Sequence, residues 1–243
     1  MARRRLGAGV AIVLVFGVAA GVAVRQSVDR RAPATTPVAS VQGAQLERDI
    51  GVDPTVTQAV RSSVTRIEAT GCGERRQGTA TLVDPGSGPR ALTNQHVVAG
   101  AARAEFRSPD GDVVSLDVAR RVADRDAALL DAGSLTDGGA RPLPVGPRPT
   151  VGSTVLVAGF PAGGFEARAG HVVSVERRHG YGGTVDMLIV DVEAIPGISG
   201  GVVVDTEGRA VGLVAARDPE TGDTVAYPLE TVEGRTRPAD SSC

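Results

Sequence analysis

Ser199 lies in a glycine-rich segment that suits nucleophilic chemistry. Gly197 precedes it by two positions, and Gly200 and Gly201 follow it directly. A serine hydroxyl attacks a carbonyl only when a base accepts its proton and when donors stabilise the oxyanion that forms. Glycines allow the backbone bends that aim two N–H groups at one point. Because the chain contains 32 glycines, this segment alone indicates little, and the prediction depends on its partners elsewhere in the chain.

A histidine and an aspartate upstream are the partners that such a serine needs. His96 lies in an apolar, strand-like setting that continues into Val97-Val98, and Asp126 directly precedes the apolar run 127–130. An imidazole placed between a carboxylate and a hydroxyl can accept the serine proton, while the carboxylate holds the imidazole in the correct tautomer. We therefore predict His96 as the general base, Asp126 as its orienting acid and Ser199 as the nucleophile.

The chain order His, Asp, Ser is that of chymotrypsin-type enzymes, and it differs from the orders in subtilisins and α/β-hydrolases. The segments around the three residues resemble those of the trypsin-like serine proteases, in particular their HtrA-like periplasmic branch, which includes membrane-anchored mycobacterial proteases linked to acid resistance. The resemblance covers about residues 56–235. It implies an all-β fold of two packed six-stranded antiparallel β-barrels, and a serine endopeptidase that needs no cofactor.

The resemblance also implies which groups surround the triad. The backbone N–H groups of Gly197 and Ser199 would form the oxyanion hole. Val214 and Ala215 would wall the specificity pocket, which receives the substrate side chain before the scissile bond. Glu193, six residues before the serine, stands where enzymes that prefer basic side chains carry an acid. Glu193 is either the floor of this pocket or a strand carboxylate paired with a nearby arginine, and the sequence leaves both interpretations open.

Residues near the site depart from the family pattern, among them Ile198 and Gln95. Ile198 directly precedes the serine, where the family usually has Asp or Asn, so activation through an ion pair with a newly cut N-terminus cannot operate. Gln95 replaces the small residue that is usual before the histidine, and it would crowd the site. These departures motivate an alternative function, a catalytically degenerate protease fold that acts as a binding or scaffold protein of the cell envelope. The complete triad favours the enzyme; acyl transfer on esters would use the same groups.

Strand-like segments separated by turn signals must position these residues. The segment 141–149 contains four prolines and cannot form a central strand, so it connects a first barrel, about 56–140, to a second, about 150–235. The histidine and aspartate then belong to the first barrel and the serine to the second. No long amphipathic helix is expected beyond the N-terminal apolar segment. The expected strands are 64–68, 79–83, 90–93, 103–106, 113–119 and 127–130, then 154–159, 167–176, 187–191, 201–204, 210–215 and 224–227.

Residues 1–25 predict a membrane anchor or a signal segment. The uncharged apolar stretch 6–24 follows Arg3-Arg4-Arg5 and would span about 28 Å, close to the ~30 Å of a bilayer core. The arginines would stay in the cytoplasm, which makes the chain a single-pass membrane protein with an extracytoplasmic protease domain. Cleavage at Gly21-Val22-Ala23 would instead secrete it, but the length of the stretch favours the anchor. The polar residues 26–55 predict a flexible linker.

The chain has two cysteines, Cys72 and Cys243. An even count, an exported chain and the resemblance favour a disulfide between them, which would tie the C-terminal tail, 236–243, to the start of the domain. Two unrelated thiols are the alternative. No pair of cysteines or histidines has the spacing of metal ligands, so no metal is expected.

Composition narrows the choice of partners and of core residues. The 26 basic residues are all arginines, and the 28 acids that balance them leave a net charge of −2. This balance gives no reason to expect nucleic acid. The expected partners are a protein or peptide substrate and, through residues 6–24, the membrane. With four Phe, two Tyr and no Trp, the core must consist of Val, Ala, Leu and Ile, a composition that favours strands.

Overall fold

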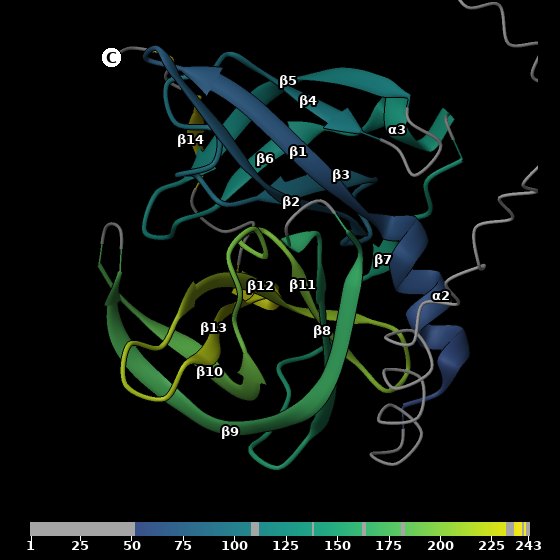
Figure 1. Ribbon diagram of the computed structural model, residues 1–243, viewed down its shortest axis with the longest axis vertical. Coiled ribbons are helices and arrows are strands. Elements are labelled where there is room, and N and C mark those ends of the chain that lie inside the picture. Colours follow the sequence, from purple (N-terminus) through teal and green to yellow (C-terminus); the bar gives the residue numbers. More distant parts are fainter. Residues whose placement is uncertain are drawn as a thin grey trace, which may run out of the picture. The chain divides into compact units, whose positions relative to one another are not determined.

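Two β-barrels form the described part of the chain (Figure 1). The predicted all-β fold of two closed six-stranded antiparallel barrels is confirmed. The predicted membrane segment 6–24 and Cys243 lie outside the described residues. Among the residues that are described, no helix is both long and apolar enough to cross a membrane. The computed structural model describes residues 52–107, 112–137, 139–161, 164–180, 183–231, 236–239 and 241.

The first barrel closes because β1 pairs with a strand on each side. It runs antiparallel to β2 and to β4, which gives the ring β1-β4-β5-β6-β3-β2. All six expected strands are present, and β1 and β2 extend further than expected because their hairpin continues to its turn at Cys72 and Gly73. The strands are β1 (Val64–Gly71), β2 (Glu74–Asp84), β3 (Arg90–Thr93), β4 (Arg103–Arg107), β5 (Val113–Val122) and β6 (Ala128–Asp131).

The second barrel closes in the order β10-β13-β12-β11-β8-β9. Its long hairpin β9–β10 exceeds the expected strand lengths at both ends. The expected strands of this half are again present. They are β8 (Thr154–Gly159), β9 (Glu166–Gly180), β10 (Gly183–Glu193), β11 (Val202–Asp205), β12 (Ala210–Arg217) and β13 (Asp223–Pro228).

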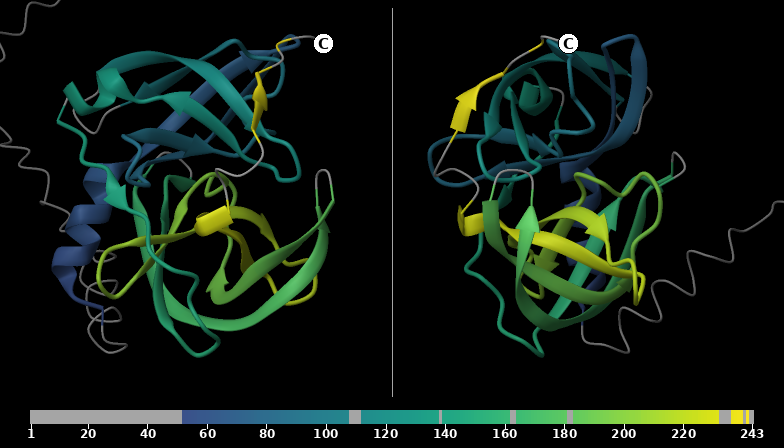
Figure 2. Two further views of the ribbon diagram at one scale, coloured as in Figure 1. Left: turned by 180° about the vertical axis from the view of Figure 1, so that it is seen from behind. Right: turned by 90° about the vertical axis from the view of Figure 1, so that its left-hand side faces the viewer.

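Two short strands outside the barrels pair with strands of the first barrel. One lies in the connection between the barrels and the other in the C-terminal tail. The proline-rich connection contributes only β7 (Leu143–Pro144), which runs parallel to β2 at the sheet margin. In the predicted tail, β14 (Thr236–Pro238) pairs with β5, so the chain returns to the first barrel after completing the second (Figure 2). The remaining short elements are α3 (Gly133–Asp137) and η2 (Leu229–Thr231).

Alternation along β2 divides its side chains between two cores. Ala80 and Leu82 belong to the core inside the first barrel. Val83 belongs to a core between the barrels, together with Leu156 of β8 and Leu213 of β12. A third core fills the second barrel. The strand β2 is therefore one of the first-barrel strands that contribute to both cores.

Helix α2 (Pro54–Ser63) precedes the first barrel, and its first two residues fall inside the segment 26–55 that was expected to be a linker. Asp53 caps the helix by accepting the Thr55 N–H at 2.8 Å, and Pro54 occupies the first helical position, which suits proline. Val56 and Val60, four residues apart, lie on one face and join the core between the barrels. With only ten residues, the helix has a weak periodic signal in the sequence.

Replacing Val60 by alanine should lower the free energy of unfolding by about 2 kcal/mol, because two methyl groups leave a fully buried position and a cavity remains. Chemical denaturation of the purified protein measures this difference. Val151→Ala is the matched control, since Val151 is 61% exposed and its truncation should change little. Equal losses at the two positions would contradict the placement of α2 against the barrels.

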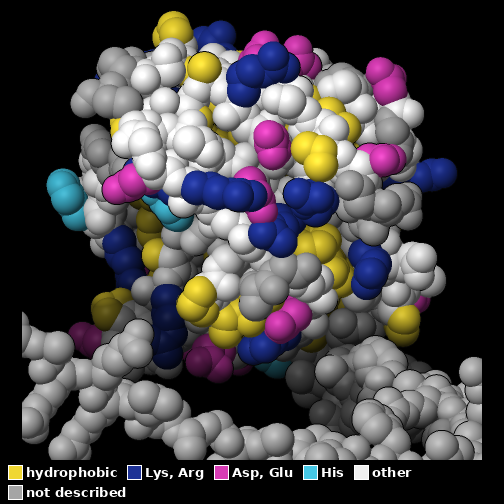
Figure 3. Space-filling model, turned by 45° about the horizontal axis from the view of Figure 1, so that its top comes forward, with side chains coloured by type: hydrophobic (Ala, Val, Ile, Leu, Met, Phe, Trp, Pro, Cys, Tyr) yellow, Lys and Arg dark blue, Asp and Glu magenta, His cyan; other side chains and the backbone are white. Residues whose placement is uncertain are grey.

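Ion pairs account for many of the arginines. Arg148, for example, bonds Asp186 at 2.8 Å and Glu230 at 2.7 Å. These bonds raise the pKa of Arg148, with the hydrogen bond to Asp186 as the largest cause. On the face shown in Figure 3, basic and acidic side chains are interspersed rather than gathered by sign.

Candidate active site

Ser199 lies in the serine loop (residues 195–201), between β10 and β11. The loop begins with a turn in which the Ile198 N–H donates to the carbonyl three residues earlier at 3.2 Å. Gly197 has φ of 95°. Proline in the second position and a glycine with positive φ in the third define a type II turn, so Pro196-Gly197 is suited to this bend. The turn places the partly buried Ser199 directly after it.

Both barrels hold the residues that follow this turn. The Ser199 carbonyl accepts the Thr79 N–H from β2 at 2.8 Å. The Gly200 carbonyl accepts the Thr81 hydroxyl at 3.2 Å, and the Gly200 N–H donates to the Val214 carbonyl at 3.0 Å. The serine loop is therefore bound to the first barrel on one side and to β12 on the other.

Ile198 anchors the serine loop by packing. Its side chain is buried in the core of the second barrel. Gly159 makes room for it, because a Cβ at that glycine would lie 2.8 Å from Ile198 Cγ1. Where the family usually has an acid, this chain therefore has a buried apolar side chain. The serine loop is held at this position by packing and not by an ion pair.

His96 and Asp126 form a bonded pair. His96 lies in the turns after β3, where the neighbouring Val97 and Val98 are buried in the first barrel. The Asp126 carboxylate accepts the His96 backbone N–H at 2.8 Å, and its second oxygen lies 2.5 Å from His96 Nδ1. With Nδ1 engaged by the carboxylate, Nε2 is the ring nitrogen left to act as a base.

Two further side chains hold the Asp126 backbone. The Asn94 amide donates to the Asp126 carbonyl at 2.7 Å, and the Asp126 N–H donates to the Tyr227 hydroxyl at 3.1 Å. Tyr227 belongs to β13, so the second barrel helps to position the aspartate of the first. Burial raises the pKa of Tyr227, which keeps its hydroxyl neutral. Neither Asn94 nor Tyr227 was predicted; Asn94 is close to His96 in sequence, whereas nothing in the sequence indicates Tyr227.

The histidine and serine segments approach each other across Gly78. A Cβ at Gly78 would lie 2.8 Å from Val97 Cγ2 and 2.9 Å from the Ser199 carbonyl oxygen. No hydrogen bond joins the His96 ring to the Ser199 hydroxyl among the described side chains. The fold thus brings the three predicted residues to one seam, with His96 and Asp126 in direct contact.

The N–H groups of Gly197 and Ser199 take no part in the bonds that hold the loop. Within the described part of the chain, neither group donates a hydrogen bond. The carbonyl of Ile198, which shares a peptide with the Ser199 N–H, is held by the Gly201 N–H at 2.8 Å. Two backbone donors on one turn are the kind of group that stabilises an oxyanion.

The predicted specificity residues fall into two sets. Val214 and Ala215 are buried on β12 beside the serine loop. Glu193 is exposed at the end of β10, and one of its carboxylate oxygens lies 3.9 Å from an Arg217 guanidinium nitrogen. One interpretation of the sequence was that Glu193 pairs with a nearby arginine instead of forming the floor of the pocket. Arg217 is such an arginine in the structure.

Asp218 organises the turn that follows Arg217. It is buried, and it accepts the N–H groups of Glu220 at 2.9 Å and Thr221 at 3.0 Å and an Arg178 guanidinium nitrogen at 2.6 Å. The Thr221 N–H, then Arg178 and the Glu220 N–H, lower the pKa of Asp218 from 3.8 to about 2.

This shift predicts a pH-dependent contribution to stability. Because the folded-state pKa is depressed, the contribution of Asp218 should be present above pH 3.8 and should disappear as the pH falls through about 2. The difference in unfolding midpoint between the wild type and Asp218→Asn should therefore be constant near neutral pH and should shrink between these two values. A difference that stays the same at pH 7 and pH 2 would contradict the assignment.

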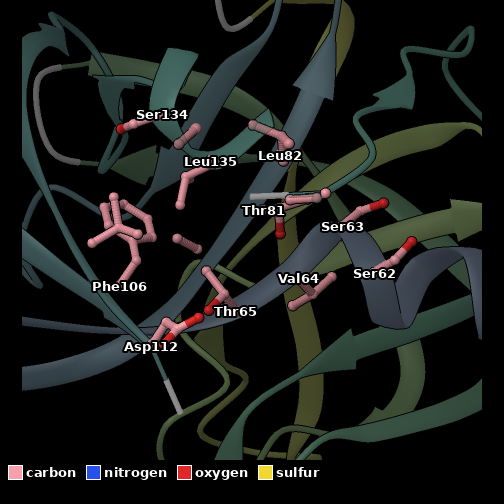
Figure 4. A pocket seen from close by; sticks show the side chains of 15 residues that line it. Ser62, Ser63, Val64, Thr65, Thr81, Leu82, Phe106, Asp112, Ser134 and Leu135 are labelled. Carbon is pink, nitrogen blue, oxygen red and sulfur yellow. The ribbon is translucent and has the colours of Figure 1, made fainter. Parts of the chain in front are cut away.

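Three other features take no part in the contact between His96 and Asp126. His171 Nδ1 lies 3.5 Å from Asp191 on the second barrel. Asp124 is only partly exposed and pairs with Arg125 at 3.7 Å. No cluster of possible metal ligands occurs among the described residues. A cavity of about 240 Å³ in the first barrel is lined by residues that include Val64, Leu82 and Phe106 (Figure 4). None of the three predicted triad residues lines this cavity.

Comparison with known proteins agrees with this geometry. A family model for the trypsin-like peptidase domain matches residues 78–213. Serine protease Rv3671c of Mycobacterium tuberculosis is 31% identical over 189 residues, which cover 70% of this chain and 45% of the relative. Protease Do-like 2, chloroplastic, of Arabidopsis thaliana is 31% identical over 163 residues, which cover 63% of this chain and 26% of the relative.

Solved structures share the fold. The crystal structure of the active form of the Rv3671c protease from M. tuberculosis superposes with a TM-score of 0.67 at 24% identity, covering 79% of this chain and 92% of that one. The HtrA-type protease AlgW with a tripeptide gives a TM-score of 0.63 at 24% identity, covering 74% of this chain and 60% of that one.

The paired barrels with a serine loop at their seam define a chymotrypsin-like protein. The chain belongs to the trypsin-like peptidase family, whose model matches more than half of it, and the curated relatives named here are a serine protease and a Do-like protease. The predicted resemblance is thereby confirmed. The chain spans less than half the length of the curated relatives named here.

Proposed function

We propose that the protein is a serine endopeptidase that hydrolyses peptide bonds of extracytoplasmic proteins through His96, Asp126 and Ser199. The observation that supports this most strongly is the two-point contact of Asp126 with His96, through the backbone N–H at 2.8 Å and Nδ1 at 2.5 Å. A carboxylate in this position holds the imidazole with Nε2 unprotonated, which is the form that can accept a serine proton.

The proposed reaction uses these groups in turn. The Ser199 oxygen forms a bond to the substrate carbonyl carbon as its proton passes to His96 Nε2, and Asp126 stabilises the resulting imidazolium. The N–H groups of Gly197 and Ser199 stabilise the oxyanion. Collapse breaks the C–N bond, and the leaving amine takes the proton from His96. Water then attacks the acyl-enzyme with the same base and releases the carboxylic acid and free Ser199.

Hydrolysis of fluorescently labelled casein by the full-length protein in detergent tests this function. Wild type should release peptides, whereas Ser199→Ala should release none above background. A folded wild type without activity on casein and on a mixed peptide library would favour the alternative, a degenerate fold that binds without cleaving.

For specificity we propose a small apolar pocket walled by Val214 and Ala215. Glu193 does not select basic side chains in this proposal, because Arg217 lies 3.9 Å from its carboxylate and offsets its charge. Peptides with valine before the scissile bond should be cleaved at least as well as those with arginine. A clear preference for arginine would instead make Glu193 the floor of the pocket.

We also propose that residues 6–24 anchor the protein so that the protease domain lies outside the cytoplasm. The support is the sequence itself, an uncharged apolar stretch after three arginines. The protein should sediment with membranes, and proteinase K added to spheroplasts should degrade it while a cytoplasmic marker survives. Protection from the added protease would contradict the proposed orientation.

Cys72 and Cys243 form a disulfide in this proposal. No free cysteine occurs among the described residues, which include Cys72, and the sequence holds one other cysteine. Cys72→Ser should therefore lower the free energy of unfolding by about 2–5 kcal/mol and lower activity with it. Reductant should destabilise the wild type to the same extent and leave Cys72→Ser unchanged. Equal stability of the wild type with and without reductant would exclude the bridge.

A further inference from the structure

Thr79 contacts the serine loop at two points. Its hydroxyl donates to the Gly197 carbonyl at 2.8 Å, and its backbone N–H donates to the Ser199 carbonyl at 2.8 Å. These two carbonyls belong to the two residues whose N–H groups form the proposed oxyanion hole. One residue of the first barrel therefore binds both ends of the segment that must stabilise the oxyanion.

The same residue connects two further segments. The Thr79 hydroxyl accepts the Phe160 N–H at 2.9 Å, and the Thr79 carbonyl accepts the Thr93 hydroxyl at 2.7 Å. Phe160 follows β8 of the second barrel, and Thr93 ends the strand that leads to His96. Thr79 thus joins the serine loop, the histidine segment and β8, and its hydroxyl both donates and accepts.

The surroundings of Thr79 enclose its hydroxyl closely. The residue is fully buried, so no solvent can replace a lost partner. A Cβ at Gly159 would lie 3.0 Å from its Oγ1, and a Cβ at Gly200 would lie closer than 3.0 Å to its carbonyl oxygen. Glycines on both sides therefore permit this close approach.

The strand β2 explains why a polar residue occupies this position. Its Ala80 and Leu82 face the interior of the first barrel, and its threonines face the serine loop. Figure 4 shows this alternation at Leu82 and Thr81, whose side chains point to opposite sides of the strand. An apolar strand face at this seam would leave the Gly197 and Gly200 carbonyls without donors.

We propose that Thr79 is a positioning residue that orients the oxyanion hole through the Gly197 carbonyl. This inference rests on the proposed function. The Gly197 carbonyl and N–H flank the same Cα, and glycine permits many backbone conformations. The Thr79 hydroxyl restrains one side of Gly197 and so limits the directions that its N–H can take. Without the hydroxyl, the loop keeps its bond at Ser199 but loses the restraint at Gly197.

Two substitutions separate the hydroxyl from the shape of the side chain. Thr79→Val keeps the volume and removes the hydroxyl, whereas Thr79→Ser keeps the hydroxyl. In the full-length protein with p-nitrophenyl acetate as acyl probe, Thr79→Val should lower kcat by about 10- to 100-fold, a part of the loss expected for a whole oxyanion donor. KM should change little. Thr79→Ser should restore kcat to within about 3-fold of the wild type.

The inhibition constant of phenylboronic acid reports on the oxyanion hole, because the adduct of the boronic acid with Ser199 mimics the tetrahedral intermediate. A loss of overall stability alone would not change this constant. Its inhibition constant should rise in Thr79→Val by the same factor as kcat falls. Ser63→Ala is the matched control for stability, since it removes another buried hydroxyl, one that donates to the Arg141 carbonyl and not to the serine loop. Ser63→Ala should lower the melting temperature without changing boronate binding.

The outcomes separate this inference from the proposed function. A wild type that neither turns over the probe nor binds the boronate would overturn the proposed function itself. An active wild type whose kcat and boronate affinity are unchanged in Thr79→Val would overturn the role of Thr79. Equal losses in Thr79→Val and Thr79→Ser, or an equal loss in Ser63→Ala, would show a general effect of destabilisation and would overturn it as well.

Discussion

Replacing Asp126 by asparagine should lower kcat/KM for peptide hydrolysis by about 10⁴-fold while the protein stays folded. The carboxylate accepts both the backbone N–H and Nδ1 of His96. An asparagine amide has nearly the same shape, but it presents an NH₂ donor to Nδ1. The imidazole would then carry its proton on Nε2 and could not accept the proton of Ser199. Hydrolysis of a fluorogenic peptide measures the rate, and circular dichroism checks the fold.

Asp124→Asn is the matched control, because Asp124 lies two residues earlier and contacts Arg125 rather than the histidine. Its activity should stay within about 3-fold of the wild type, as expected when a partly exposed ion pair is lost. Comparable losses at the two positions, or wild-type rates for Asp126→Asn, would contradict the assignment of the orienting acid.

Gly200→Ala should be the most damaging change in the serine loop. Gly200 has φ of 84°, and a Cβ there would come closer than 3.0 Å to the Thr79 carbonyl oxygen. The serine loop would have to move off β2, which misplaces Ser199. We expect a loss of about 4 kcal/mol or more in the free energy of unfolding and at least about a 10²-fold loss of activity. Denaturant unfolding and peptide hydrolysis measure the two effects.

Gly208→Ala separates backbone strain from the clash. Gly208 has a similar φ of 81°, but nothing lies within 4 Å of a Cβ there. This variant should lose about 1–2 kcal/mol, the cost of a left-handed alanine, and should keep its activity. If Gly200→Ala were no worse than Gly208→Ala, the close contact between the serine loop and β2 would be refuted.

Strand positions and the order of the site residues could be predicted from the sequence because both are local signals. Alternating apolar runs bounded by glycine and proline indicated every strand of the two barrels, but not the short β7 and β14 outside them. The motifs around His96, Asp126 and Ser199 indicated the family, and the fold brings their segments to one seam.

Contacts that cross between the barrels could not be predicted, because no local pattern encodes them. Tyr227 reaches the Asp126 backbone from β13, and Thr79 reaches Gly197 from β2. The partner of Glu193 lies on another strand of the same barrel, and it was left open because the sequence does not encode which strands are neighbours. The helix before β1 was missed because it is short. Ile198 was identified as a departure, but only packing shows that it anchors the loop by burial.

Covalent labelling by a fluorophosphonate tests the central claim most directly, since it requires the nucleophile, the base and the oxyanion donors at once. The full-length, disulfide-bonded protein should take one label, which mass spectrometry should locate on Ser199. Ser199→Ala should take none, and His96→Ala should react far more slowly. A folded wild type that remains unlabelled, or that is labelled at another residue, would contradict the account.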